Sequence, residues 1–314
     1  MKTIFMGTPD FAVGTLEALV EAGHEITLVV TQPDRPKGRG HAMQYPPVKE
    51  AALAHHLQVY QPERIRDEEA VRVLEAAEAE VIVVVAFGQL IPGEILRMKR
   101  YGCINVHGSL LPKYRGAAPI QWAVINGERE SGVTTMQMDE GLDTGDILLK
   151  TVVPLDEKET GGSLFERLAD AGARLCVETL RRLEQGDLQP QPQGEATTAY
   201  ASMLNREMGR IDWTKDAAAI ERLIRGLNPW PSASTTCRGR TMKIWAAEPR
   251  PAEKSGGVCG EILAVTKDAL LVQTGDGVLA VRELQMEGRK RMDAGAFLRG
   301  FAVEPGTVLG DAGI

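Results

Sequence analysis

The stretch that decides the fold is Val81-Ile82-Val83-Val84-Val85-Ala86, six apolar residues of which five are β-branched. A run with no polar side is typical of a strand that is covered on both faces, as in a parallel sheet. It follows a segment with a helical pattern at 67–77 and precedes another short apolar run at 103–106. This alternation predicts a β-α-β unit around a central strand.

The same alternation continues toward the N-terminus. Residues 2–6 form a short apolar run that ends at Gly7, and Thr8-Pro9 then supplies an N-cap and a proline for the first turn of a helix. A strand pattern covers 26–30, and a helix pattern covers 47–57. We therefore predict an α/β fold with a Rossmann-like, mostly parallel sheet and helices on both faces. Ligands of such sheets bind beyond the carboxyl ends of the strands, which directs attention to the loops after residues 6, 30, 86 and 106.

The first of these loops argues against a dinucleotide cofactor. It reads Gly7-Thr8-Pro9-Asp10-Phe11-Ala12, which is not G-x-G-x-x-G. Pro9 stands where the second glycine would let a pyrophosphate approach the backbone. We therefore do not expect a hydride-transfer enzyme.

The composition changes after a long helical pattern at 160–185. Residues 186–198 are polar and rich in proline and glutamine, which is typical of a linker. A helix pattern at 217–227 follows, and then short β-rich runs that glycines interrupt, which predict a small, OB-like β-barrel. We therefore predict a catalytic domain at 1–188, a linker at 189–206 and a second domain at 207–314.

Composition and charge restrict the class of protein. No run approaches the roughly 18–20 apolar residues of a membrane span, and the N-terminus lacks the features of a signal peptide, so we expect a cytoplasmic protein with no membrane contact. The four cysteines have neither disulfide-framework nor zinc spacing, so we expect no metal. The net charge of -7 argues against a general nucleic-acid binder. The charge is uneven, because residues 207–314 hold 15 Lys and Arg against 14 Asp and Glu, and the preceding part holds 21 against 29.

A polar segment follows the predicted strand at 103–106 and reads Asn105-Val106-His107-Gly108-Ser109-Leu110-Leu111-Pro112-Lys113-Tyr114-Arg115-Gly116. Asn105 and His107 are two residues apart, so on a strand they point to the same side. An amide and an imidazole side by side can hold a developing oxyanion. The alternative is that both side chains only satisfy a turn.

A second polar segment, Met138-Asp139-Glu140-Gly141-Leu142-Asp143-Thr144-Gly145-Asp146, gathers four carboxylates in a glycine-containing loop. Carboxylates that crowd together raise one another's pKa, so one of them can relay a proton near neutral pH. An acidic turn or a divalent-metal loop are the alternatives. The calcium-loop spacing D-x-[DN]-x-[DN]-G-x₅-E is absent.

Together the two segments, N-x-H-x-S-L-L-P-x-x-R-G and D-x-G-x-D-T-G-D, resemble the folate-dependent formyltransferases. Three further segments resemble the members of that family that act on methionyl-tRNA: the basic loop 33–40, Arg210-Ile211-Asp212-Trp213 and Asn228-Pro229-Trp230-Pro231. The resemblance runs almost from end to end. It implies transfer of the formyl group of 10-formyltetrahydrofolate to the α-amino group of methionyl-initiator tRNA, which gives N-formylmethionyl-tRNA for translation initiation.

The resemblance also implies roles for individual residues. The catalytic residues carry over to Asn105, His107 and Asp143, with the first two holding an oxyanion and the third assisting proton transfer. Contacts with the reduced folate carry over to Ser109, Leu110, Leu111, Pro112, Phe87, Gly88, Leu90, Ile91 and Asp139. Contacts with tRNA are expected from Arg35, Lys37 and Arg39 in the basic loop, and from Arg238, Arg240 and Lys243 in the second domain.

Two other functions stay open from the sequence. One is a folate-dependent formyltransferase that acts on a small nucleotide-linked amine, for which about the first 200 residues would be enough. The other is a non-catalytic RNA-binding protein, against which the intact Asn105, His107 and Asp143 argue. We expect a monomer, because no long apolar edge is visible in the sequence.

Overall fold

The computed structural model describes residues 1–37, 42–251 and 257–310. The chain forms two compact units. The first unit comprises Met1–Pro119, Glu130–Pro154 and Phe165–Ala201, and the second comprises Ile120–Arg129, Leu155–Leu164 and Ser202–Ile314. Two short segments that precede residue 188 therefore belong to the second unit. Each unit is described by itself below.

A seven-stranded sheet forms the centre of the first unit, in the order β5-β2-β1-β6-β7-β8-β9. The first five strands in this order pair in parallel, whereas β8 is antiparallel to both of its neighbours. The predicted mostly parallel sheet is thus confirmed. The strands are β1 (Lys2–Gly7), β2 (Glu25–Val30), β5 (Val59–Tyr60), β6 (Val81–Val85), β7 (Cys103–His107), β8 (Glu130–Gln137) and β9 (Ile147–Pro154).

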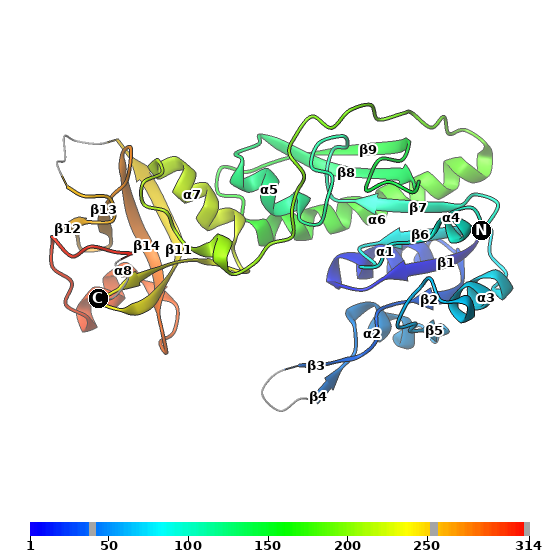
Figure 1. Cartoon of the computed structure of the whole chain (residues 1–314), viewed down its shortest axis with the longest axis horizontal. Coiled ribbons are helices and arrows are strands. Elements are labelled where there is room, and N and C mark those ends of the chain that lie inside the picture. The colour runs from blue at the N-terminus through cyan, green and yellow to red at the C-terminus, as the bar shows by residue number, and fades with distance from the viewer. Residues whose placement is uncertain (38–41, 252–256, 311–314) are drawn as a thin grey trace. The chain divides into compact units, whose positions relative to one another are not determined.

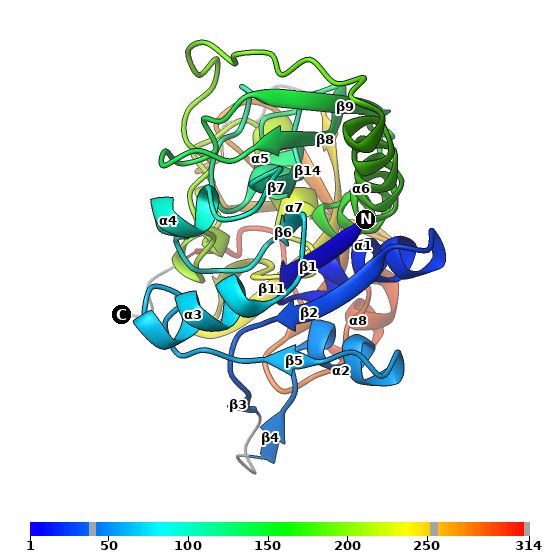
Figure 2. The ribbon, with the colours of Figure 1, turned by 90° about the vertical axis from the view of Figure 1, so that its right-hand side faces the viewer.

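Helices cover both faces of this sheet, as predicted (Figure 2). One face carries α1 (Asp10–Glu21), α2 (Pro47–Ala54) and α6 (Gly161–Gln185), and the other carries α3 (Glu68–Ala76) and α4 (Gly93–Leu96). All five side chains of β6 are buried, which explains why its sequence has no polar side. A short hairpin of β3 (Arg35–Lys37) and β4 (Ala42–Gln44) stands apart from the sheet.

The segment between α6 and the second unit is extended rather than helical (Figure 1). Gln191 pairs with Ile147 at the start of β9, and Ala201 pairs with Gly116. Residues 191–201, which we call the strap, therefore run along the first unit and are hydrogen-bonded to it at both ends.

The second unit is built on a six-stranded antiparallel sheet with the order β10-β11-β14-β13-β12, to which β15 adds beside β14. Helix α7 packs against β11 and β14 (Figure 1), and Asp216 caps it by accepting from Ala219 N at 2.7 Å. Within the described residues β10 does not pair with β12, so the strand pairing shows a sheet and does not confirm the predicted barrel. The elements are α5 (Pro119–Ile125), a 3-10 turn η1 (Glu207–Gly209), α7 (Ala217–Gly226), β10 (Ala233–Cys237), β11 (Arg240–Arg250), β12 (Ile262–Val265), β13 (Leu270–Gln273), β14 (Val278–Met286), β15 (Met292–Asp293) and α8 (Ala294–Gly300).

None of the helices in the described residues combines the length and the apolar character that a membrane crossing requires. No three His, Cys, Asp or Glu side chains in this part of the chain come together as a metal-binding group.

Candidate active site

The loops at the carboxyl end of the parallel strands are tied to one another. The Thr8 hydroxyl, just after β1, donates to the backbone oxygen of Phe87, just after β6, at 2.9 Å. Gln32 Nε2, from the loop after β2, donates to the same oxygen at 3.2 Å. The loops after β1 and β2 are thus both hydrogen-bonded to the loop after β6. These bonds connect the loops at the edge of the sheet where β7 ends.

Asn105 and His107 lie on β7 and are both buried, with 8% and 6% of their surface exposed. Their two-residue spacing places them on one side of the strand, as predicted. Cys103 precedes them on the same strand, and burial raises the pKa of its thiol to about 12. Such a thiol does not ionise near neutral pH, so Asn105 and His107 are the polar groups of this strand that can take part in chemistry.

The imidazole of His107 is oriented by a backbone carbonyl. Its Nε2 lies 2.9 Å from the oxygen of Tyr114. A carbonyl only accepts hydrogen bonds, so Nε2 carries a hydrogen and donates it. The other ring nitrogen, Nδ1, is therefore the one that can exchange a proton with a neighbouring group.

Asp143 faces that nitrogen. Its Oδ1 lies 3.8 Å from His107 Nδ1, and its Oδ2 accepts from the backbone N–H of Gly116 at 2.8 Å. The 3.8 Å separation is longer than a hydrogen bond, so these two atoms are not bonded to each other. One atom of a bound molecule can therefore contact both Nδ1 and Oδ1. Asp143 has φ 55°, a left-handed backbone conformation that is uncommon for residues other than glycine. Such a conformation persists only where neighbouring contacts hold it.

Asn105 completes the group. Its side chain makes no hydrogen bond to any other residue within the described part of the chain. An amide donor without a partner among the described residues can donate to an oxygen on which negative charge develops. The structure therefore brings Asn105, His107 and Asp143 together, from β7 and from the loop that follows β8.

The loop 109–112 is hydrogen-bonded to β8 and β9. Ser109 Oγ donates to the oxygen of Lys113 at 2.6 Å, and Thr134 Oγ1 accepts from Leu111 N at 3.1 Å. The Leu111 side chain is fully buried, and Lys150 Nζ donates to the Leu111 oxygen. Ser109 and Leu111 thus face the protein interior. Leu110 and Pro112 are the partly exposed members of the loop that offer surface to a ligand.

The other residues expected to contact folate differ in their surroundings. The ring of Phe87 is buried in the core of the first unit. Gly88 has φ 88°, and Leu90 is 78% exposed. Ile91 packs partly against the same core, and the Asp139 carboxylate accepts from Gly141 N and Thr144 Oγ1 within its own loop.

The residues expected to contact tRNA fall in both units. Arg35 is exposed on β3, Lys37 ends that strand, and Arg39 lies outside the described residues. Arg238 stands at the β10–β11 turn over the ring of Phe301, and Arg240 donates to the oxygen of Glu287. Lys243 and Arg291 lie on the ring of Trp245, at 5.7 and 4.7 Å from its centroid.

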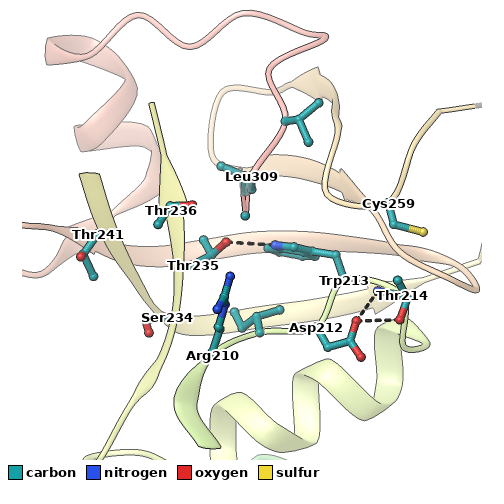
Figure 3. A pocket seen from close by; sticks show the side chains of 13 residues that line it. Arg210, Asp212, Trp213, Thr214, Ser234, Thr235, Thr236, Thr241, Cys259 and Leu309 are labelled. Atoms are coloured by element: carbon teal, nitrogen blue, oxygen red, sulfur yellow. Dashed lines mark hydrogen bonds between the residues drawn. The ribbon is translucent and has the colours of Figure 1, made fainter. Parts of the chain in front are cut away.

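A cavity of about 650 Å³ in the second unit contains none of the predicted site residues (Figure 3). Arg210, Asp212 and Trp213 line it together with Ser234, Thr235 and Thr236 of the neighbouring strand β10. The indole N–H of Trp213 donates to Thr235 Oγ1 at 3.0 Å, and Asp212 accepts from Thr214. The motif Arg210-Ile211-Asp212-Trp213 therefore anchors the second unit's core through its two apolar residues, which are both 5% exposed.

Four residues that were not predicted from the sequence contact His107, Asp143 or their neighbours. Tyr114 engages His107 through its carbonyl, and Gly116 engages Asp143 through its N–H. The other two are residues of the strap, Gln193 and Thr198, which bond the backbones of Asp143 and Tyr114. Gly116 belongs to the motif that we quoted, and its φ of 125° explains the glycine. No signal marks Gln193 or Thr198, because both lie in a segment whose composition is typical of a linker.

Comparison with known proteins identifies the family. The profile described as "Formyl transferase" matches residues 1–180, and "Formyl transferase, C-terminal domain" matches residues 203–302. A protein named methionyl-tRNA formyltransferase from Agathobacter rectalis is 57% identical over 307 residues, which cover 98% of this chain and 99% of that protein. A protein of the same name from Clostridioides difficile is 50% identical over 310 residues, which cover 99% of this chain and all of that protein.

Solved structures share the fold at low identity. An N-formyltransferase from Helicobacter canadensis, in complex with folinic acid and dTDP-3-aminofucose, is 19% identical, with a TM-score of 0.68 over 91% of this chain and 100% of that chain. HypX from Aquifex aeolicus in complex with tetrahydrofolic acid is 21% identical, with a TM-score of 0.64 over 97% of this chain and 49% of that chain. The resemblance that we saw in the sequence is confirmed, and the chain belongs to the formyl transferase family.

Proposed function

We propose that this chain transfers the formyl group of 10-formyltetrahydrofolate to the α-amino group of methionyl-initiator tRNA, giving N-formylmethionyl-tRNA for translation initiation. Near-full-length relatives named methionyl-tRNA formyltransferase support the substrate, because they match this chain across both units. The single observation that supports the chemistry most is the convergence of Asn105, His107 and Asp143 at the carboxyl end of β7.

The reaction is acyl transfer to nitrogen. The neutral amino group of the methionyl ester attacks the formyl carbon on the folate, and a tetrahedral intermediate forms with negative charge on its oxygen. Asn105 Nδ2 donates to that oxygen, and so does His107 through Nδ1 when this nitrogen carries a proton. Each such donor is typically worth about 2.7–4 kcal/mol of barrier.

Asp143 lies where it can stabilise positive charge on the imidazole, since its Oδ1 is 3.8 Å from Nδ1. The attacking amine loses a proton as the new C–N bond forms, and the folate nitrogen gains one as the old bond breaks. A free α-amine titrates near about 8, so little base strength is needed to make it neutral before it attacks. After the attack, the newly bonded nitrogen is positively charged and gives up its extra proton readily. Asp143 accepts it, directly or through a water molecule, and returns it to the leaving nitrogen.

The proposed folate site lies at the loops after β6 and β7. Leu110, Pro112 and Leu90 offer apolar surface there, and the backbone around Gly88 and the Asp139 loop offer polar groups. We place the tRNA contacts at Arg35, Lys37 and Arg39 for the acceptor end. In the second unit, Arg238, Arg240 and Lys243 contact phosphates.

We further propose that the catalytic domain spans 1–188, the linker 189–206 and the tRNA-binding, OB-like domain 207–314, and that the protein is a cytoplasmic monomer. Light scattering at micromolar concentration tests the last point, and a mass near twice 34.1 kDa would refute it.

The experiment that tests the function is formyl transfer from 10-formyltetrahydrofolate to charged initiator methionyl-tRNA. Charged elongator methionyl-tRNA and glycinamide ribonucleotide serve as competing acceptors. Preference for the initiator tRNA supports the proposal. Transfer to the ribonucleotide alone would keep the catalytic residues and refute the role of the second unit. Binding of tRNA without any turnover would instead indicate a non-catalytic RNA-binding protein.

A further inference from the structure

The strap, residues 191–201, contacts the parts of the chain that orient both His107 and Asp143. On the His107 side, Thr198 Oγ1 accepts from the backbone N–H of Tyr114 at 2.7 Å. Tyr114 adopts a left-handed backbone conformation, with φ 55°. Its carbonyl accepts the hydrogen bond from His107 Nε2. One hydrogen bond from the strap thus holds the residue whose carbonyl orients the imidazole.

On the Asp143 side, the strap acts through Gln193. Its Nε2 donates to the backbone oxygen of Asp143 at 3.0 Å and to that of Gly145 at 2.6 Å. Its Oε1 accepts from Arg115 Nε at 3.2 Å and Nη2 at 3.0 Å. The same guanidinium also donates to the oxygen of Gly194 at 2.8 Å. One amide therefore joins the Asp143 loop to the loop that follows β7.

The end of the strap holds the carboxylate of Asp143 as well. Ala201 accepts from the backbone N–H of Ala117 at 2.8 Å and donates to the oxygen of Arg115 at 2.8 Å. Gly116 lies between these two residues and donates to Asp143 Oδ2. A Cβ on Gly116 would lie 2.6 Å from the Ala201 oxygen, so the backbones are in direct contact at this point.

We propose that Gln193 and Thr198 are positioning residues for formyl transfer: Gln193 holds Asp143 in its left-handed conformation, and Thr198 holds Tyr114 so that His107 presents Nδ1 to the substrate. The inference rests on the proposed function. Neither residue touches the reacting atoms, and each acts through a backbone group of the loops that carry or orient the catalytic side chains. A misplacement of about 1 Å in such loops costs on the order of 100-fold in rate.

The decisive variant is Gln193→Glu in the full-length chain. A carboxylate still accepts from Arg115 but cannot donate, and it brings a negative oxygen against the carbonyls of Asp143 and Gly145. The matched control is Gln191→Glu, which adds the same charge two residues away on an exposed side chain. Thr198→Val, with the exposed Thr197→Val as its control, tests the His107 side in the same way.

We expect Gln193→Glu and Thr198→Val to lower kcat by roughly 10- to 100-fold, with both controls within about 3-fold of the wild type. Gln193→Ala separates positioning from a general loss of structure, because its effect must depend on Asp143. In an Asp143→Asn background, Gln193→Ala should lower kcat by less than about 3-fold, since the coupled residue has already been disabled. Equal losses in both backgrounds would overturn the inference, and so would a Gln193→Glu enzyme as active as its control.

A measurement that does not use activity keeps the inference testable on its own. Amide hydrogen exchange should become faster in residues 139–146 in Gln193→Ala and remain unchanged in Gln191→Glu. Unchanged exchange in both variants would refute the contact's role. If the wild type failed to formylate methionyl-tRNA, the proposed function would fall, whereas the exchange experiment would still decide whether the strap holds the Asp143 loop.

Discussion

The replacement Asp143→Asn removes one charge from the catalytic group and keeps its shape. The amide oxygen of asparagine still accepts from Gly116 N–H, which holds the side chain in place. Asparagine is also tolerated in the left-handed conformation of this residue. The change therefore removes the negative charge beside His107, and with it the group that accepts the amine's proton, while the side chain keeps its place.

The magnitude follows from the distance. Two unit charges 3.8 Å apart interact by about 4 kcal/mol at an effective dielectric constant of about 20. The Asp143 side chain is 22% exposed, so water weakens this interaction. We take about 2–4 kcal/mol, which corresponds to a loss of roughly 30- to 1,000-fold in kcat.

Single-turnover transfer to charged initiator methionyl-tRNA gives the rate, and fluorescence titration with a reduced folate gives the affinity. We expect the rate to fall by the stated factor and the folate affinity to change by less than about 3-fold, because the charge acts on His107 in the transition state. Glu140→Gln is the matched control, since it removes the same charge from the same loop at an exposed pair with Arg97. Equal losses in rate and affinity, or a rate within about 3-fold of the wild type, would refute the reasoning.

Three further changes test the structure elsewhere. Burial, and then the charged N-terminus, lower the pKa of His24 from its ordinary 6.5. The unfolded state therefore binds more protons than the folded state as the pH falls below 6.5, and the free energy of unfolding should decline there. Urea titrations at each pH should show a smaller decline in His24→Gln. Cys259 is exposed and should react rapidly with a thiol reagent. Burial raises the pKa of the Cys103 thiol to about 12, so Cys103 should react only after unfolding. A rapid reaction phase that remains in Cys259→Ser would contradict this. Gly132→Ala should lower the free energy of unfolding by about 1–3 kcal/mol, since its Cβ would lie 2.2 Å from a backbone oxygen of β9. Gly14→Ala, in open space on α1, should raise the free energy of unfolding by about 0.5–1 kcal/mol. The opposite order of the two variants in urea titrations would refute the packing argument.

The parts of the fold that could be predicted are those whose signal is local. The β-branched run 81–85 became β6, because a run with no polar side fits a strand that is buried on both faces. The short run at 103–106 became β7. The two long strands β8 and β9 gave no such signal. They carry buried polar residues whose partners lie on other elements, such as Thr135, whose hydroxyl lies 2.8 Å from that of Thr179 on α6.

The candidate site shows the same division. Asn105 and His107 could be placed side by side because their spacing on one strand decides it. The approach of Asp143 depends on how β8 pairs with β7, and only the family resemblance suggested it. The burial of the Phe87 ring could not be foreseen, because an apolar residue at a strand end can face either the core or a ligand.

The strap has a consequence for how the protein can be divided. A chain cut at residue 188, where the composition predicts the end of the first domain, would lose Gln193, Thr198 and Ala201 and with them three tethers of the site. A chain cut after Ala201 would keep all three. The strap thus connects the two units and is also part of the first one. Its length and sequence are therefore more constrained than those of a linker that makes no contacts.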